Sequence, residues 1–450
     1  MTDAKAIKYV GQPLRRREDF KFVTGKGRYT DDIKSPGMLQ MAVLRSPHAH
    51  AVIRKVDLSA AQSAPGVGLA LSGADLAGKI GAIVPNWIIP GTKVPDRPVV
   101  AIDRVRFVGE CVALVVAETQ AMAHDAIGLI DVDYEALPAV TCEEAAIRDG
   151  APQLHDNVPG NITTIYKIGG GDYKKAAQEA DQVIRLRVVN NRLIPTCMET
   201  RSILAEPDIS GTLTLYLQSQ VPHMHRRWIA DAVGISEHQL RVVAPDIGGG
   251  FGAKMHLYPE ELLCPYLARE FGVPVKWWES RSESHQSTNH GRAHTETIEI
   301  AIRNDGKILG LRVDTLGNVG AYLSNMASGG PTVNTINFGT GAYKIEHYEA
   351  RGDGVLLLLG QESWDRIAAT ITGDGKLLHR AWAARTFAHT LDALSDSRRV
   401  ETLDLLVVAT DVYTWKLLRR DRALTRGDTA SRMRMLVAAI ISAASSEIQE

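Results

Sequence analysis

The chain has 450 residues, of which 45% are apolar and 23% are charged, the balance of a globular protein with room for about two to four domains. Its 51 basic and 52 acidic residues give a formal net charge of −1. A charge this close to neutral excludes a global electrostatic attraction to nucleic acid or to an anionic membrane. No uninterrupted apolar run reaches the roughly 18 residues that span a bilayer, so we expect no membrane span.

The 4 cysteines stand singly along the chain, without the C-x-x-C spacing of zinc and iron–sulfur sites. We interpret them as reduced, mostly buried thiols. Near the start, Arg15-Arg16-Arg17 is followed by acidic residues and not by the apolar segment of a twin-arginine export signal. We therefore expect a cytoplasmic protein whose iron–sulfur centre, if it takes part in redox chemistry, lies on another chain.

Residues 1–18 are polar and predict an N-terminal arm, and residues 19–140 predict an α+β domain. One helix is expected over 119–127, where Thr119 can serve as the N-cap. Short apolar or alternating runs between turn residues indicate strands. The predicted strands cover 39–44, 69–72, 99–102, 111–117 and 129–134.

Residues 141–166 contain prolines and glycine with few apolar residues, which predicts a connector. Residues 167–350 then predict a second α+β domain. Helices are expected over 222–233 and 257–271, the second kinked or restarted at Pro265. The predicted strands of this domain cover 182–189, 212–217, 239–243, 273–278 and 295–300.

Near Ala350 the strand signals stop, and residues 351–450 predict an all-helical C-terminal domain. A helical run continues over 398–419. Thr425 and Asp428 form a capping-box-like start for a last helix through Ile441. Helical spacing also relates the apolar residues Leu378, Trp382, Phe387, Leu391 and Leu394.

A glycine-rich loop, Gly248-Gly-Gly-Phe-Gly252, connects the predicted strand 239–243 to the predicted helix 257–271. Glycines let the backbone approach a phosphate closely, and the first N–H groups of a following helix are unpaired donors at the positive end of its dipole. The loop therefore predicts a site for a phosphorylated cofactor. A turn that only reverses the chain is the plainer alternative.

The same loop also fits the pattern G-x-G-x-x-A through Gly248, Gly250 and Ala253, with Glu279 after the next predicted strand. That pattern is typical of dinucleotide-binding βαβ units. An NAD-type dehydrogenase is therefore a further alternative, and it requires a parallel βαβ unit around Gly248.

Six motifs follow one another in an order typical of one family. The chain resembles the molybdopterin-binding large subunit of the xanthine dehydrogenase, aldehyde oxidase and carbon monoxide dehydrogenase family over about residues 10–350. The resemblance implies an α/β hammerhead domain followed by the first half of the molybdenum-cofactor-binding region. The motifs are Thr24-Gly-Lys-Gly-Arg-Tyr-Thr-Asp-Asp-Ile33, Arg45-Ser-Pro-His-Ala-His-Ala51, Arg106-Phe-Val-Gly-Glu-Cys-Val-Ala113, Asp131-Val-Asp-Tyr-Glu-Ala-Leu-Pro138, Cys197-Met-Glu-Thr-Arg201 and Gly248-Gly-Gly-Phe-Gly252.

The resemblance also implies site residues. It places Gly249, Gly250, Phe251 and Gly252 at the pterin and molybdenum, and it gives Gln220 a hydrogen bond to an oxo ligand of molybdenum. An amide N–H can orient an oxo group without adding charge.

The implied activity is oxidation of a small aldehyde or N-heterocycle with water as the oxygen source. The implied cofactor is molybdenum-molybdopterin in its cytosine dinucleotide form. The implied partners are an iron–sulfur small subunit carrying [2Fe–2S] clusters and an FAD-binding medium subunit.

The chain departs from the family after Ala350. Members continue into a second cofactor-binding half whose glutamate, in a Gly-x-Gly-Glu setting, is the general base. Here Arg351-Gly-Asp-Gly-Val355 follows instead, and no Gly-x-Gly-Glu occurs downstream. The catalytic base is therefore unknown, and we expect a truncated, inactive chain, because general acid–base catalysis needs a positioned base.

The tail has a separate resemblance. Asp411-Val-Tyr-Thr-Trp-Lys-Leu-Leu-Arg-Arg-Asp421 is similar to the C-terminal ligand-binding and dimerisation domain of tetracycline-repressor-type regulators. No helix-turn-helix is evident, so this resemblance implies no DNA binding. It supports a non-enzymatic alternative, in which the tail binds a ligand or forms a homodimer.

Other polar residues are interpreted as structural. The pairs His48/His50 and His223/His225 lack a third ligand, so we predict no metal site at either. Glu199 and Arg201 are expected to form an ion pair with each other. A polar run from His285 through Asn289 and His290 to His294 predicts a loop.

Overall fold

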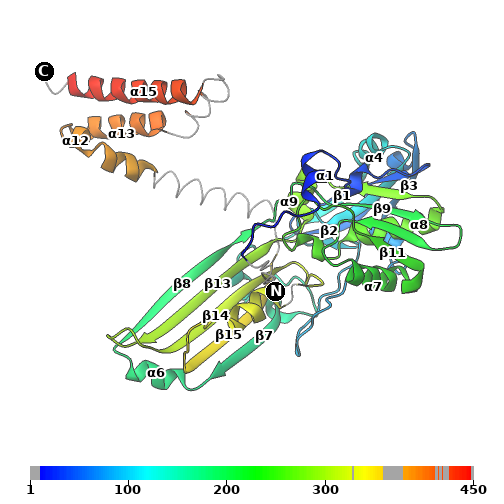
Figure 1. Cartoon of the computed structure of the whole chain (residues 1–450), viewed down its shortest axis with the longest axis horizontal. Helices are drawn as coiled ribbons and strands as arrows, with labels where there is room; N and C mark the ends of the chain where they lie inside the picture. The colour runs from blue at the N-terminus through cyan, green and yellow to red at the C-terminus, as the bar shows by residue number, and fades with distance from the viewer. Residues whose placement is uncertain are drawn as a thin grey trace, which may run out of the picture. The chain divides into compact units, whose positions relative to one another are not determined.

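The computed structural model describes residues 11–326, 329–357, 379–410, 414, 418 and 425–446 (Figure 1). The chain divides into two compact units, Met1–Gln361 and Glu362–Glu450. The first unit holds three sheets, and the second is helical. The predicted α+β class with a helical tail is therefore confirmed.

The first unit is built on a seven-stranded sheet with the order β11-β10-β9-β12-β1-β5-β3. Strand β5 is buried along its whole length, as its continuous apolar sequence CVALVVA predicts. Strands from both predicted domains meet in this sheet, because β1 pairs in parallel with β12. The strands are β1 Leu39–Arg45, β3 Val67–Ser72, β5 Cys111–Ala117, β9 Ser202–Pro207, β10 Leu213–Leu217, β11 Leu240–Val243 and β12 Val275–Trp278.

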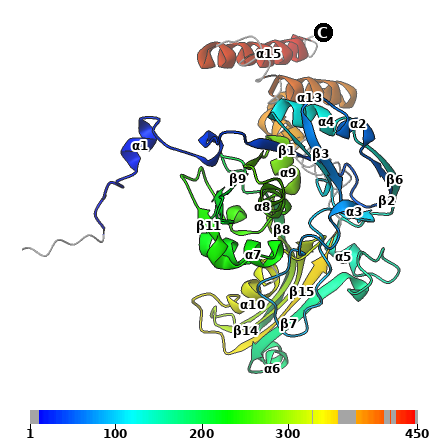
Figure 2. The same cartoon turned by 90° about the vertical axis from the view of Figure 1, so that its right-hand side faces the viewer.

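Two longer helices, α7 (Pro222–Val233) and α8 (Pro259–Phe271), share one apolar core with this sheet (Figure 2). Helix α8 continues through Pro265, so a restart of the helix at that residue is wrong. Helix α4 (Gln120–Ile127) begins as predicted, because the Thr119 side chain accepts a hydrogen bond from the Met122 N–H at 3.2 Å. Shorter helices are α1 Asp19–Val23, α2 Ser59–Gln62, α3 Gly73–Leu76 and α9 Arg281–Ser287.

A three-stranded sheet has the order β4-β2-β6, formed by Arg104–Val105, Ala51–Asp57 and Asp131–Ala136. The predicted strand at 99–102 is wrong, because these residues form bends. Val99, Val100 and Ala101 are buried, so their apolar character reflects packing and not strand pairing. The Ala101 carbonyl lies so close to Gly73 that a Cβ there would meet it at 2.0 Å.

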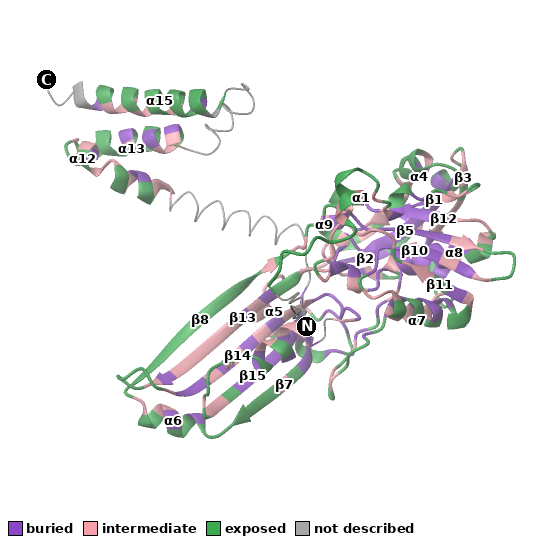
Figure 3. Ribbon diagram, in the orientation of Figure 1, coloured by how far each residue is buried: buried purple, intermediate pink, exposed green. Residues whose placement is uncertain are grey.

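The third sheet has five long strands in the order β7-β15-β14-β13-β8. Helix α6 (Tyr173–Glu179) and the segment η5–α10 (Gly330–Asn337) pack against it. Strand β8 is an edge strand and is exposed at nearly every residue (Figure 3). The strands are β7 Ile162–Gly170, β8 Gln182–Leu193, β13 Gly291–Ile302, β14 Ile308–Gly320 and β15 His347–Leu356.

Strands β7, β14 and β15 were not predicted. Strand β7 starts within the predicted connector 141–166, which also contains α5 (Glu143–Ala146), and β15 extends past Ala350. Among the described residues, no helix is long and apolar enough to cross a membrane.

The second unit contains α12 (Ala388–Leu391), α13 (Asp396–Thr410) and α15 (Arg426–Ser446). The predicted cap of α15 is confirmed, because the Asp428 N–H donates to Thr425 Oγ1 at 3.1 Å. The core of this unit includes the buried residues Leu391, Leu406, Ala409 and Ala444. Leu378 lies outside the described residues, as do 411–413, 415–417 and 419 of the predicted helical run 398–419.

Candidate cofactor-binding site

The glycine loop lies between β11 and α8, but the helix does not begin at the glycines. A short 3₁₀ turn, Ala253–Met255, comes first. The helix then starts at Pro259, where the Tyr258 N–H donates to Glu261 Oε2 at 3.1 Å in a capping box. The predicted contribution of a helix N-terminus to the loop is therefore wrong, because α8 is capped by its own side chain.

The dehydrogenase alternative is also contradicted. A dinucleotide-binding βαβ unit has a glycine turn that leads directly from its first strand into the helix, and its second strand lies beside the first in the sheet. Here β10 and β9 separate β11 from β12.

Backbone conformation requires glycine in this loop. Gly249 and Gly252 have φ values of +99° and +89°, which residues with a Cβ rarely adopt. Phe251 has a φ of +49°, an uncommon conformation for a bulky residue that concentrates at functional sites. At Gly250 a Cβ would lie 2.6 Å from Gln220 Cδ, and at Gly248 it would lie 2.5 Å from Glu199 Cβ.

Glu199 fixes both ends of the loop. Its Oε2 atom accepts hydrogen bonds from the Gly248 N–H at 2.7 Å and from Lys254 Nζ at 3.1 Å. Lys254 is only 2% exposed, and its ammonium also donates to the Glu199 carbonyl at 2.9 Å. Charge-assisted bonds of this kind hold the loop in one conformation.

The predicted ion pair between Glu199 and Arg201 is not formed. Arg201 instead pairs with Glu279 at 2.5 Å and with Glu260 at 3.0 Å, and Arg45 reaches Glu260 at 2.6 Å. Burial alone would raise the pKa of Glu260, but Arg45 and Arg201 lower it to about 2. This buried network stabilises the base of the site, because each charge in it has a partner of opposite sign.

Gln220 lies directly against the glycine loop. Its side-chain Oε1 accepts a hydrogen bond from the Gly252 N–H at 3.0 Å. The backbone N–H of Gln220 donates to the Lys254 carbonyl at 2.9 Å. Since the side-chain carbonyl is used in this way, the amide Nε2 remains as a donor. Within the described part of the chain, no residue accepts a hydrogen bond from Gln220 Nε2.

The loop backbone provides further donors. Among described residues, no acceptor meets the N–H groups of Gly249, Gly250 and Phe251. Successive N–H groups of this kind form a concave site for an anion. The loop and Gln220 thus offer hydrogen-bond donors without an acceptor among the described residues, and such donors suit the phosphate and oxo groups of a molybdenum–pterin cofactor.

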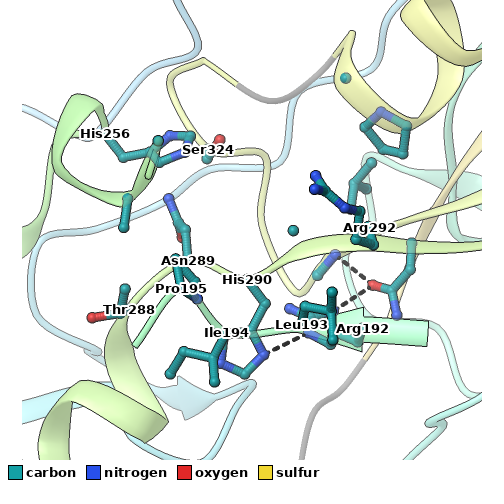
Figure 4. Close-up of a pocket in the computed structure, with 18 of the residues that line it drawn as sticks. Arg192, Leu193, Ile194, Pro195, His256, Thr288, Asn289, His290, Arg292 and Ser324 are labelled. Carbon is teal, nitrogen blue, oxygen red and sulfur yellow. Dashed lines mark hydrogen bonds between the residues drawn. The ribbon is translucent and has the colours of Figure 1, made fainter. Parts of the chain in front are cut away.

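A cavity of about 590 Å³ lies beside the loop. Phe251, whose side chain is 76% exposed, contributes to its wall, whereas Gln220 does not line it. Other lining residues come from β8, β14 and the connection from α9 to β13 (Figure 4). They include Arg192, Asn289 and His290, which Figure 4 labels together with His256 from the segment before α8. Arg97 and Tyr322 also line the cavity.

The polar run from His285 to His294 is not a single loop. His285 belongs to α9 and His294 to β13, and only the residues between these elements form the connection. His290 Nδ1 accepts a hydrogen bond from Arg192 Nε at 2.9 Å. Burial lowers the pKa of His290 and of His256 to about 4, so both imidazoles are neutral at pH 7.

One histidine of each H-x-H pair has a structural contact. His50 Nδ1 bonds the Pro138 carbonyl at 2.8 Å, and the buried His225 bonds Ser219 Oγ at 2.5 Å. The described residues contain no group of three or more His, Cys, Asp or Glu side chains that could hold a metal ion.

Comparison with known families finds two matching domains along the chain. Residues 24–138 match the a/b hammerhead domain of aldehyde oxidase and xanthine dehydrogenase. Residues 154–366 match the molybdopterin cofactor-binding domain. The glycine loop, Gln220 and the residues that line the cavity all lie within the second match, apart from Arg97 and Phe107.

Individual relatives cover the same part of the chain. The nicotine 6-hydroxylase large subunit of Paenarthrobacter nicotinovorans is 35% identical over 314 residues, which are 70% of this chain and 38% of that protein. The carbon monoxide dehydrogenase large chain of Afipia carboxidovorans is 35% identical over 78% of this chain and 45% of that protein. Quinoline 2-oxidoreductase from Pseudomonas putida 86 has a similar structure, with a TM-score of 0.74 and 36% identity over 76% of this chain and 44% of its own.

Residues 24–366 thus define a hammerhead domain joined to a molybdopterin-binding domain. The chain belongs to the family of molybdopterin-binding large subunits that includes the xanthine dehydrogenases and carbon monoxide dehydrogenases. It spans less than half the length of the nicotine 6-hydroxylase and carbon monoxide dehydrogenase subunits that it matches.

Proposed function

We propose that this chain is the cofactor-binding portion of a molybdenum hydroxylase large subunit that oxidises a small aldehyde or N-heterocycle with water as the oxygen source. The observation that carries the proposal is the contact between Gln220 and the glycine loop. Glu199 and Lys254 hold that loop in a conformation that leaves several N–H donors available.

The backbone and side-chain donors of the site have different roles. The N–H groups of Gly249, Gly250 and Phe251 bind the cofactor, and the amide of Gln220 orients an oxo group. The bound molybdenum centre supplies the two-electron oxidation chemistry. The side chain of Phe251, next to the cavity, excludes water from one wall of the site.

No Asp or Glu is among the described residues that line the cavity, so none of them can serve there as the general base of the reaction. Glu261 has a pKa raised to about 8, chiefly by burial, which is a suitable range for a base. However, it caps α8 beneath the site and is buried, so it does not reach the cavity. We propose that a further segment of the large subunit supplies the base, and that this chain alone binds cofactor without turnover.

We also propose the cytosine dinucleotide form of the cofactor, and partner subunits that carry [2Fe–2S] clusters and FAD. One relative is named as a subunit of a dehydrogenase complex, which supports an assembly of several chains. All four cysteines of this chain are unpaired, which is consistent with a reducing cytoplasm.

A homodimer through the helical unit is a second proposal. Leu405 and Val408 are 55% and 63% exposed on successive turns of α13. Exposed apolar residues on one helix face are typical of association surfaces. The change Leu405→Glu should abolish dimers in analytical ultracentrifugation, and an unchanged sedimentation coefficient would contradict the proposal.

Cofactor retention tests the main proposal. The full chain, purified from a host that makes the cofactor, should release a fluorescent pterin after oxidation. The variant Gly250→Val should release none, because its side chain would occupy the place of Gln220. Equal pterin from both proteins would overturn the assignment of the loop.

A further inference from the structure

Arg192 lines the cavity and has only neutral partners. Its Nε donates to His290 Nδ1 at 2.9 Å, and one terminal nitrogen donates to Asn318 Oδ1 at 3.0 Å (Figure 4). The pKa of Arg192 is lowered to about 10, because burial disfavours the charged form and only Glu143 acts in the opposite direction. Among the described residues, no carboxylate forms an ion pair with this guanidinium.

Arg97 is a second guanidinium at the same cavity, and it is only 8% exposed. Its guanidinium carbon lies 5.7 Å from the centroid of the Tyr322 ring. Burial lowers its pKa, although Tyr322 and Glu110 offset part of the effect. In the described part of the chain, Arg97 also forms no ion pair.

Two other buried arginines of the same unit show the contrast. Arg45 and Arg201 lie against Glu260, and Arg201 also contacts Glu279. Burial alone would lower the pKa of Arg45 and of Arg201, but the carboxylates beside them raise both. Among the described residues, the arginines of the buried network therefore have carboxylates in ion-pair contact, whereas Arg97 and Arg192 have none.

An unneutralised buried charge is costly unless a ligand provides the opposite charge. The planar guanidinium fork also matches the geometry of carboxylate and phosphate oxygens. A neutral donor is available in the same cavity, because Asn289 Nδ2 is buried and meets no acceptor among the described residues.

We propose that this cavity is an oxyanion subsite, in which Arg97 and Arg192 bind the carboxylate or phosphate group of a ligand beside the glycine loop. The choice of source rests on the proposed function. The oxyanion is either a phosphate of the bound cofactor or the carboxylate of an anionic substrate. Binding of the oxyanion itself depends only on residues of this chain.

Titration of the metal-free full chain tests the proposal. Inorganic pyrophosphate and benzoate serve as probes, followed by isothermal titration calorimetry and by the rise in thermal midpoint. Both probes should bind the wild type. The variants Arg97→Gln and Arg192→Gln should each weaken binding by about ten- to a hundredfold, the effect of losing a hydrogen bond to a charged group.

Two further variants separate charge from fold. Arg227 on α7 is a matched control, since its side chain is 69% exposed, and Arg227→Gln should bind the probes like the wild type. Arg192→Lys keeps the charge but loses the fork, so it should bind more strongly than Arg192→Gln. Circular dichroism verifies the fold of each variant. Wild-type affinity in folded Arg97→Gln and Arg192→Gln, or equal loss in Arg227→Gln, would overturn the subsite.

The source of the oxyanion is decided by repeating the benzoate titration on cofactor-loaded protein. Loss of benzoate binding on loading assigns the subsite to a cofactor phosphate, and retained binding assigns it to a substrate carboxylate. Failure of the wild type to load cofactor would overturn the proposed function, whereas the result on the metal-free chain would stand.

Discussion

Lys254 is bonded to Glu199 at both the carboxylate and the carbonyl, at 3.1 and 2.9 Å, although only 2% of the lysine is exposed. Glu199 in turn holds the Gly248 N–H. The Glu199 side chain therefore bonds to both ends of the glycine loop, at Gly248 and at Lys254. The conformation of the loop depends on these bonds.

Removing one partner of this pair should be strongly destabilising. We predict that Lys254→Met lowers the free energy of unfolding by about 3 to 5 kcal/mol, because it leaves a carboxylate without counter-charge in a buried setting. The double variant Glu199→Gln/Lys254→Met should lose less than the single variant. Urea unfolding measures both, and a loss below about 1 kcal/mol for Lys254→Met would contradict the role of the pair.

The lack of a side chain at Gly250 should matter more for binding of the cofactor than for folding of the chain. The Cβ of Gly250→Ala would lie 2.6 Å from Gln220 Cδ, and since Gln220 is exposed its side chain can move away. We predict a change in unfolding free energy of less than about 1 kcal/mol, together with loss of cofactor.

Gly170→Ala is the control for Gly250→Ala, because no atom lies within 4 Å of its added Cβ. It should retain cofactor like the wild type. Full cofactor content in Gly250→Ala would show that the Gln220 position does not matter.

Glu261 should make the protein less stable as pH rises. Its folded-state pKa of about 8 lies above the unfolded value of about 4.3, so the folded state binds the extra proton. Its contribution is fully present below pH 4.3 and is lost between that pH and 8, with a slope of up to about 1.4 kcal/mol per pH unit.

Glu261→Gln keeps the acceptor for the Tyr258 N–H and removes the titration. Unfolding free energies measured between pH 5 and 8 should fall less steeply in this variant. A slope equal to that of the wild type would contradict the assignment.

His225 should act in the opposite direction. Burial lowers its folded-state pKa to about 4, below the unfolded value of about 6.5. Its contribution to stability is therefore present above pH 6.5 and is lost as pH falls towards 4. His225→Gln should reduce this acid sensitivity in urea unfolding, whereas His223→Gln, an exposed change on the same helix, should leave it unchanged.

The elements predicted correctly from the sequence are those with a clear local signal, such as a continuous apolar run or a proline at the start of a helix. Strand β5 and helix α7 have the predicted bounds, because a continuous apolar run and a proline start are unambiguous signals. Strands β14 and β15 were missed because glycine weakens a strand pattern. Their glycines allow close packing, since a Cβ at Gly352 would meet the Thr332 carbonyl at 2.5 Å.

The site was only partly predictable for a related reason. Motifs identify Gln220 and the glycine loop, but the significance of Arg97 and Arg192 depends on the lack of an ion-paired carboxylate among the residues that the structure describes. Sequence spacing gives no indication of such a lack, because the two arginines belong to segments far apart in the chain. Arg192 lies near the end of the edge strand β8 and Arg97 directly precedes Pro98, and neither position gives a functional signal in the sequence.

The most direct test of the account is the molybdenum-to-protein ratio of the full chain, measured by elemental analysis after purification from a host that makes the cofactor. We predict molybdenum in the wild type and none in Gly250→Val, with both proteins folded by circular dichroism. A folded wild-type protein without molybdenum would contradict the claim that the loop and Gln220 form a cofactor site.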